Sequence, residues 1–95
     1  MTELTSSATV VRSPELLFSS IDRELVIFEI KQDTYFSLDD IGADIWRRLE
    51  RPVAVTALCS GLAEHYVAEP SVIERDVLVL LAEMQAAGLV VVSAP

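Results

Sequence analysis

The chain has 95 residues, a length that suits one small domain with a single core and argues against a second domain. Its composition, 52% hydrophobic and 23% charged, is typical of a globular protein and excludes a disordered chain. The formal net charge of −8 repels phosphate backbones, which argues against nucleic-acid binding.

The N-terminal residues 1–13 are small and polar, so we expect a flexible tail there, with the ordered domain spanning 14–92 and a loose C-terminus at 93–95. This tail lacks the basic region and apolar core of a signal peptide. No apolar run reaches the roughly 20 residues that a membrane helix needs. A cytoplasmic location without membrane contact is therefore predicted, in agreement with the single cysteine, Cys59.

Three β-prone segments follow Pro14. Apolar residues at 16–21, the run 24–30 and the segment 34–38 are separated by short polar turns, which predicts a three-stranded antiparallel meander. In the third strand Phe36 and Leu38 are expected on one face, and Tyr35 and Ser37 on the other.

A first helix is predicted to begin at Asp39 or Asp40, because a carboxylate there accepts a hydrogen bond from the free N–H groups of the first turn. Pro52 ends it. Its apolar stripe consists of Ile41, Ile45 and Leu49, with Trp46 beside them.

Two further helices are predicted. Residues 53–66 form the second, whose start at Ala54 lacks a good capping side chain. Ser71 and Glu74 form a capping box that opens the third, and Gly88 ends it in a left-handed conformation. Residues 89–92 then add a short strand or pack on the core. The core stripe of the third helix is Ile73, Val77, Leu80, Leu81 and Met84.

Residues suited to catalysis are scarce. Cys59 is interpreted as a small buried hydrophobe and His65 as a surface residue near a helix end, while Asp39 and Asp40 serve a turn and a cap. No pair of Cys or His has metal-ligand spacing, and no glycine-rich phosphate loop is present. We therefore predict no catalytic residues, no metal and no cofactor, and a protein that is not an enzyme.

A meander with three helices also permits a winged-helix DNA-binding regulator. A recognition helix needs Arg, Lys, Asn or Gln toward the bases, whereas the third helix offers Arg75 and Gln85 against Glu74, Asp76 and Glu83. The charge disfavours this alternative.

The third strand is an edge if the meander follows chain order, and an open edge accepts an extended peptide as a further strand. Extra apolar positions on the third helix, Val72 and Val79, would wall such a groove. The alternative is a structural interaction module whose edge and helix residues bind no peptide.

The order and spacing of several short motifs resemble the PqqD-like proteins, which are precursor-peptide recognition elements of ribosomally made, modified peptides. The resemblance covers Pro14 to Val92. Its motifs are Tyr35-Phe36-Ser37-Leu38, Ile41-Gly42, Ile45-Trp46, Leu49, Val55, Leu58, Leu62, Tyr66, Asp76-Val77, Leu80-Leu81, Met84 and Gly88-Leu89-Val90.

This resemblance implies an α+β, winged helix-turn-helix-like fold, with a three-stranded antiparallel sheet followed by three helices. The third strand and third helix would hold the leader segment of a precursor peptide, added as a fourth strand. The chain is similar to free-standing elements of lasso peptide biosynthesis, which implies delivery of the leader to a separate cysteine-type leader peptidase or another modifying enzyme. A PqqD-type chaperone for a radical enzyme in another peptide-modification pathway is the related alternative.

Carried over by position, the resemblance implies a peptide site made of a β-pairing edge and helix residues that contact the leader's side chains. Leu80 also falls on the predicted core stripe, and Asp76 also suits the first turn of a helix. The predicted site residues are Thr34, Tyr35, Phe36, Ser37 and Leu38 on the edge, and Arg75, Asp76, Val79, Leu80 and Glu83 on the helix.

Overall fold

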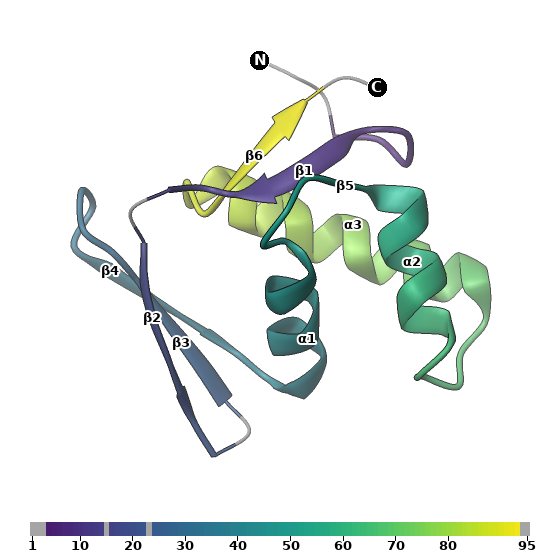
Figure 1. Ribbon diagram of the computed structural model, residues 1–95, viewed down its shortest axis with the longest axis horizontal. Helices are drawn as coiled ribbons and strands as arrows, with labels where there is room; N and C mark the ends of the chain where they lie inside the picture. The colour runs from purple at the N-terminus through teal and green to yellow at the C-terminus, as the bar shows by residue number, and fades with distance from the viewer. Residues whose placement is uncertain (1–3, 15, 23, 94–95) are drawn as a thin grey trace.

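A computed structural model describes residues 4–14, 16–22 and 24–93 and shows two separate antiparallel sheets and three helices (Figure 1). The predicted α+β class is confirmed. In chain order the elements are β1 (Thr9–Arg12), β2 (Leu17–Ile21), β3 (Glu24–Glu29), β4 (Thr34–Leu38), α1 (Asp40–Arg48), β5 (Val53–Ala54), α2 (Val55–Ala63), α3 (Pro70–Ala86) and β6 (Val90–Ser93).

Strands β2, β3 and β4 form the predicted meander, which we call the meander sheet. β3 lies in the centre and pairs with both neighbours, so β2 and β4 are its two edges. The predicted faces of β4 are also confirmed, because Leu38 is buried and Phe36 half-buried, while Tyr35 and Ser37 are exposed. Tyr35 packs on Phe28 of β3 on the outer face, with ring centroids 4.8 Å apart.

A second sheet, which we call the terminal sheet, was not predicted. It has the order β5-β1-β6 and brings Thr9–Arg12 between residues 53–54 and the C-terminal strand. The expected flexible tail is therefore wrong for residues 8–12, since Ala8 and Val10 are fully buried. These short apolar side chains join the core through pairing with segments far away in the sequence. Residues 1–3 and 94–95 of the expected tails lie outside the described residues, and Ser93 belongs to β6.

Helix α1 begins where predicted. The Asp39 side chain is the N-cap, with its Oδ1 2.9 Å from the backbone N of Gly42. Ile45, Trp46 and Leu49 are buried, whereas Ile41 is 48% exposed at the helix start and is not part of the core. Figure 1 shows α1 standing between the meander sheet on one side and α2 on the other.

Helix α2 has no side-chain cap at Ala54, as predicted, and it ends at Ala63, so Tyr66 lies beyond it. Gly61 fits a close contact: a β-carbon there would lie 2.5 Å from Nη1 of Arg48 on α1. Gly61 therefore leaves room for the Arg48 side chain. This contact offsets the low helix propensity of glycine at position 61.

The start of α3 corrects one prediction. The helix begins at Pro70 with Glu69 as N-cap and has no side-chain cap hydrogen bond, so the capping box of Ser71 and Glu74 is wrong. Proline is well suited to the first helical position, because it lacks the N–H that would otherwise go unpaired. Pro70 thus moves the helix start ahead of Ser71.

The end of α3 is a Schellman motif centred on Gly88, which has φ +78° as predicted. The N–H of Leu89 donates to the carbonyl of Met84 at 2.8 Å, and the N–H of Gly88 donates to Gln85 at 3.1 Å. Leu89 and Met84 are both buried, which adds the apolar contact that accompanies this motif. The chain then turns back into β6.

One hydrophobic core joins the three helices, the terminal sheet and the inner face of the meander sheet. Trp46 is its largest fully buried side chain. In the part of the chain that the structure describes, no helix has the length and apolar character needed to cross a membrane.

Replacing Gly88 tests the left-handed helix end. We expect Gly88→Ala to lower the free energy of unfolding by about 1–2 kcal/mol, because a β-carbon disfavours this conformation. Chemical denaturation followed by circular dichroism measures the loss. Gly88→Asn is the matched control and should lose less, since Asn tolerates positive φ better than Ala. Equal losses for both variants would contradict the assignment.

Candidate functional site

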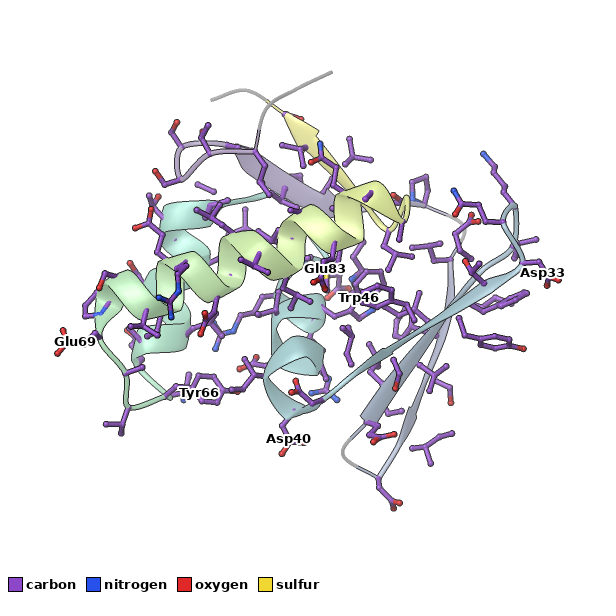
Figure 2. The ribbon with its side chains drawn as sticks, turned by 180° about the vertical axis from the view of Figure 1, so that it is seen from behind. Asp33, Asp40, Trp46, Tyr66, Glu69 and Glu83 are labelled. Carbon is purple, nitrogen blue, oxygen red and sulfur yellow. The ribbon has the colours of Figure 1, made fainter. Side chains whose placement is uncertain are left out.

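A groove of about 630 Å³ lies between β4, α1 and α3. Figure 2 views the molecule from the side where β4 and α3 diverge around α1. Its lining comes from the start of β3, the second half of β4, one face of α1, the end of α2, the α2–α3 connection and one face of α3. The lining residues are Glu24, Phe36, Ser37, Leu38, Asp39, Ile41, Gly42, Ile45, Leu62, Tyr66, Ala68, Val72, Ile73, Asp76, Val77, Leu80 and Glu83.

Apolar side chains from three elements make the walls of this groove. Phe36 and Leu38 face it from β4, Ile41 from α1, and Val72 and Leu80 from α3. Phe36, Val72 and Leu80 are half-buried and Ile41 is exposed, so each leaves apolar surface open to a ligand. Burial of such surface favours association, and pockets of this kind give an added strand its sequence preference.

One side of the groove is the open edge of β4. In the described part of the chain this strand pairs only with β3. Because partner residues of an antiparallel ladder alternate between hydrogen-bonded and non-bonded pairs, alternate residues of β4 direct their N–H and C=O groups outward. The edge thus offers main-chain hydrogen bonds beside an apolar wall.

Tyr66, which lines the groove from the α2–α3 connection, is held in place by a polar network with α1. The Tyr66 hydroxyl donates to Oδ2 of Asp44 at 3.0 Å, and Arg48 Nε donates to Oδ1 of the same carboxylate at 3.0 Å. Figure 2 shows Tyr66 reaching from the α2–α3 connection toward α1. Burial raises the pKa of the Tyr66 phenol above its ordinary value, and the hydrogen bond to Asp44 raises this pKa further. The phenol therefore stays protonated at neutral pH and remains a donor that fixes this wall.

Four acidic residues line the groove: Glu24, Asp39, Asp76 and Glu83. None of the described residues in its lining is Lys or Arg. Asp76 pairs with Arg75, whose Nε lies 3.5 Å from Asp76 Oδ1, with both side chains about 70% exposed. A pair so exposed contributes little to stability.

The structure brings six of the ten predicted site residues into the groove lining: Phe36, Ser37, Leu38, Asp76, Leu80 and Glu83. Thr34 lies on β4 ahead of the lined stretch, and Tyr35 points to the outer face of the meander sheet, where it is 74% exposed. Val79 is 56% exposed and does not line the groove. Arg75 does not line it either.

Several lining residues were not predicted as site residues. The sequence places Tyr66 only at the end of the predicted second helix, and Asp39 only as a cap. Glu24 enters the groove because β3 pairs antiparallel with β4, which sets Leu25 opposite Leu38. That pairing follows from the predicted meander, so Glu24 could have been found from the sequence.

Groups with catalytic chemistry do not gather in this groove. Among the described residues no three His, Cys, Asp or Glu side chains are grouped as metal ligands. Cys59 lies in a smaller hollow beside α2, where burial raises the pKa of its thiol and the Glu74 carboxylate raises it further. The thiol is therefore protonated at neutral pH, a poor state for a nucleophile.

Two solved structures of similar fold bear on this groove. One is described as TbiB1 in complex with the TbiA(beta) leader peptide; it is 26% identical, with a TM-score of 0.78, covering 84% of this chain and 93% of that chain. The other is lasso peptide synthetase B1 complexed with the leader peptide, at 23% identity and a TM-score of 0.76, covering 86% of this chain and 96% of that one.

A search of curated proteins finds no match to this chain. The family model described as coenzyme PQQ synthesis protein D (PqqD) matches residues 24–90, which include the meander from β3 onward, all three helices and every residue of the groove lining. The match covers well over half of the 95 residues, so this chain is a member of the PqqD family.

Proposed function

We propose that this domain binds the leader segment of a ribosomally made precursor peptide as an added strand on the edge of β4. The observation that carries the proposal is the open β4 edge beside an apolar groove walled by α3. An extended peptide laid there would pair with the strand and bury alternate side chains against Phe36 and Leu80. The leader peptides bound to the two solved structures of similar fold support this ligand class.

The leader belongs to a lasso peptide precursor, and the domain delivers it to a separate cysteine-type leader peptidase or another modifying enzyme. The lasso peptide system named for one solved structure of similar fold supports this assignment. The domain contributes binding and presentation and leaves the chemistry to its partner. The protonated state of Cys59 and its distance in the fold from the groove agree with this division.

A titration with a synthetic leader tests the proposal. The probe is a synthetic leader of a lasso peptide precursor, and its binding is followed by amide shifts in NMR spectra of the labelled domain. We expect shifts concentrated on β4 and on the Val72 to Glu83 face of α3. Shifts confined to the terminal sheet, or no shifts at high micromolar peptide, would overturn the proposal.

Two leucines of α3 form a matched pair for testing the apolar wall. Both are half-buried, but Leu80 lines the groove and Leu78 faces away from it. We expect Leu80→Ala to weaken leader binding by about 1–2 kcal/mol, roughly five- to thirtyfold in Kd, because the leader loses an apolar contact. Leu78→Ala should leave Kd nearly unchanged. Fluorescence anisotropy of a labelled leader measures both, and equal Kd values would remove Leu80 from the site.

Two serines test whether the leader pairs with the edge of β4. Hydrogen-bonded and non-bonded pairs alternate along the ladder, beginning with the hydrogen-bonded pair Ile21–Glu24 at the first hairpin turn. By this count Ser20 on β2 and Ser37 on β4 both lie in non-bonded pairs with β3, so both N–H groups point away from β3. Ser20 is on the β2 edge and Ser37 on the β4 edge. Proline removes the N–H and obstructs pairing at either edge.

We expect Ser37→Pro to weaken leader binding by about tenfold or more, since it removes a hydrogen bond and adds a steric obstacle. Ser20→Pro should bind the leader as the unmodified domain does. Circular dichroism checks that both variants are folded before the anisotropy titration. A folded Ser37→Pro variant with unchanged affinity would show that the leader does not pair there.

A further inference from the structure

The groove is apolar along its walls and acidic at its margins. Its four ionisable lining residues with charge at neutral pH, Glu24, Asp39, Asp76 and Glu83, all carry the same sign. A bound peptide lies close to these negative charges as well as to the apolar walls, so its own charge affects how tightly it binds. The apolar walls and the β4 edge form the peptide site, and the carboxylates set which charges it prefers in the peptide.

The four carboxylates differ in whether they have a hydrogen-bond or ion-pair partner within the protein. Asp39 accepts a hydrogen bond from Gly42, and Asp76 lies beside the exposed Arg75. No ion pair within the described residues engages Glu24 or Glu83. Both side chains are exposed, so they keep their charge available to a ligand at the surface.

The acidic side chains stand at both ends of the groove. Glu24 and Asp39 mark the end where β4 passes into α1, because Leu25 pairs with Leu38. Glu83 lies toward the other end, where the turn before β4 approaches the end of α3. The approach is seen at Gln32 in that turn, whose Nε2 would lie 3.9 Å from a β-carbon added to Gly88. Figure 2 shows Glu83 on α3 facing the centre of the molecule, and Asp40 at the opposite, α1 end of β4.

We propose that the groove selects a leader segment in which apolar anchor residues are flanked by Lys or Arg, a preference that rests on the proposed leader-binding function. The long stems of these residues lie over apolar walls while their charged ends reach acidic margins. The same margins repel an acidic segment with similar apolar residues, so the charge adds discrimination that the walls alone lack.

A matched pair of glutamates on α3 tests this preference. Glu83→Gln and Glu74→Gln each remove one negative charge from the same helix and from an exposed position, but only Glu83 lines the groove. Anisotropy titrations use a synthetic lasso precursor leader that contains Lys and Arg, and a second peptide in which its Lys and Arg residues are replaced by Gln.

We expect Glu83→Gln to weaken binding of the unmodified leader about two- to fivefold, the range of one exposed charge pair, and Glu74→Gln to have a smaller effect. With the Gln-substituted leader, the unmodified domain should bind more weakly and Glu83→Gln should cause no further loss. Raising the NaCl concentration from about 50 to about 500 mM should weaken only the unmodified leader, because salt screens exposed charges.

The outcomes separate this inference from the function on which it rests. If both peptides bind equally well, or the leader binds without any Lys or Arg in its bound segment, the charge preference is wrong and leader binding stands. Equal effects of Glu83→Gln and Glu74→Gln would also overturn it, because only the overall charge would then matter. If neither peptide binds, the proposed function fails together with this inference.

Discussion

The structure depends on Trp46, which packs where its two sheets meet. The sheets share no strand, so side-chain packing sets how they lie against each other. The Trp46 ring is fully buried on α1 and meets Phe18 of β2 edge to face, with centroids 5.9 Å apart. The guanidinium of Arg12 on β1 lies 5.2 Å from the Trp46 ring and 5.0 Å from the Phe18 ring. One residue from each sheet thus packs on the same indole, which fixes their relative position.

The groove exists because α1 leaves β4 at a defined angle. Asp39 caps the helix, and Gly42 allows the first turn to approach the strand, since a β-carbon there would lie 3.1 Å from Cβ of Leu38. With α1 held by Trp46 and α3 packed behind it, the space between β4 and α3 is wider than their side chains fill. Tyr66, tied to Asp44, closes one end of it. The site is therefore a product of packing geometry more than of any single motif.

Local chemistry accounts for what the sequence predicted well. The meander follows from alternating apolar residues between polar turns, the start of α1 from Asp39, and the end of α3 from Gly88. Each depends on residues within a few positions of one another. The terminal sheet escaped prediction because residues 9–12 pair with positions 53–54 and 90–93, and pairing over such separations leaves no local pattern. The start of α3 was misplaced because Pro70 competed with a plausible cap one residue later.

The same division holds for the candidate site: some of its residues could be predicted from neighbouring sequence, and others are placed only by packing between distant segments. The inward faces of Phe36 and Leu38 were predictable from strand alternation, whereas Leu80 and Glu83 were implied only by the resemblance to PqqD-like proteins. Tyr35 was predicted to belong to the pairing edge through its backbone; its side chain packs outward on Phe28, because a strand points successive side chains to opposite faces. Tyr66 depends on how α2 sits against α1, which only the assembled fold shows.

The open edge of β4 also exposes the molecule to a hazard, because an unpaired strand can join the same strand of another copy. Each copy carries a net charge of −8, and two such edges brought together would set their acidic margins against each other. Like charges at close range oppose that encounter, so the composition of the domain protects the open edge of β4 from self-association. A short peptide of opposite charge does not meet this barrier. The acidity of the chain thereby serves colloidal stability in the crowded cell while the pairing edge remains available.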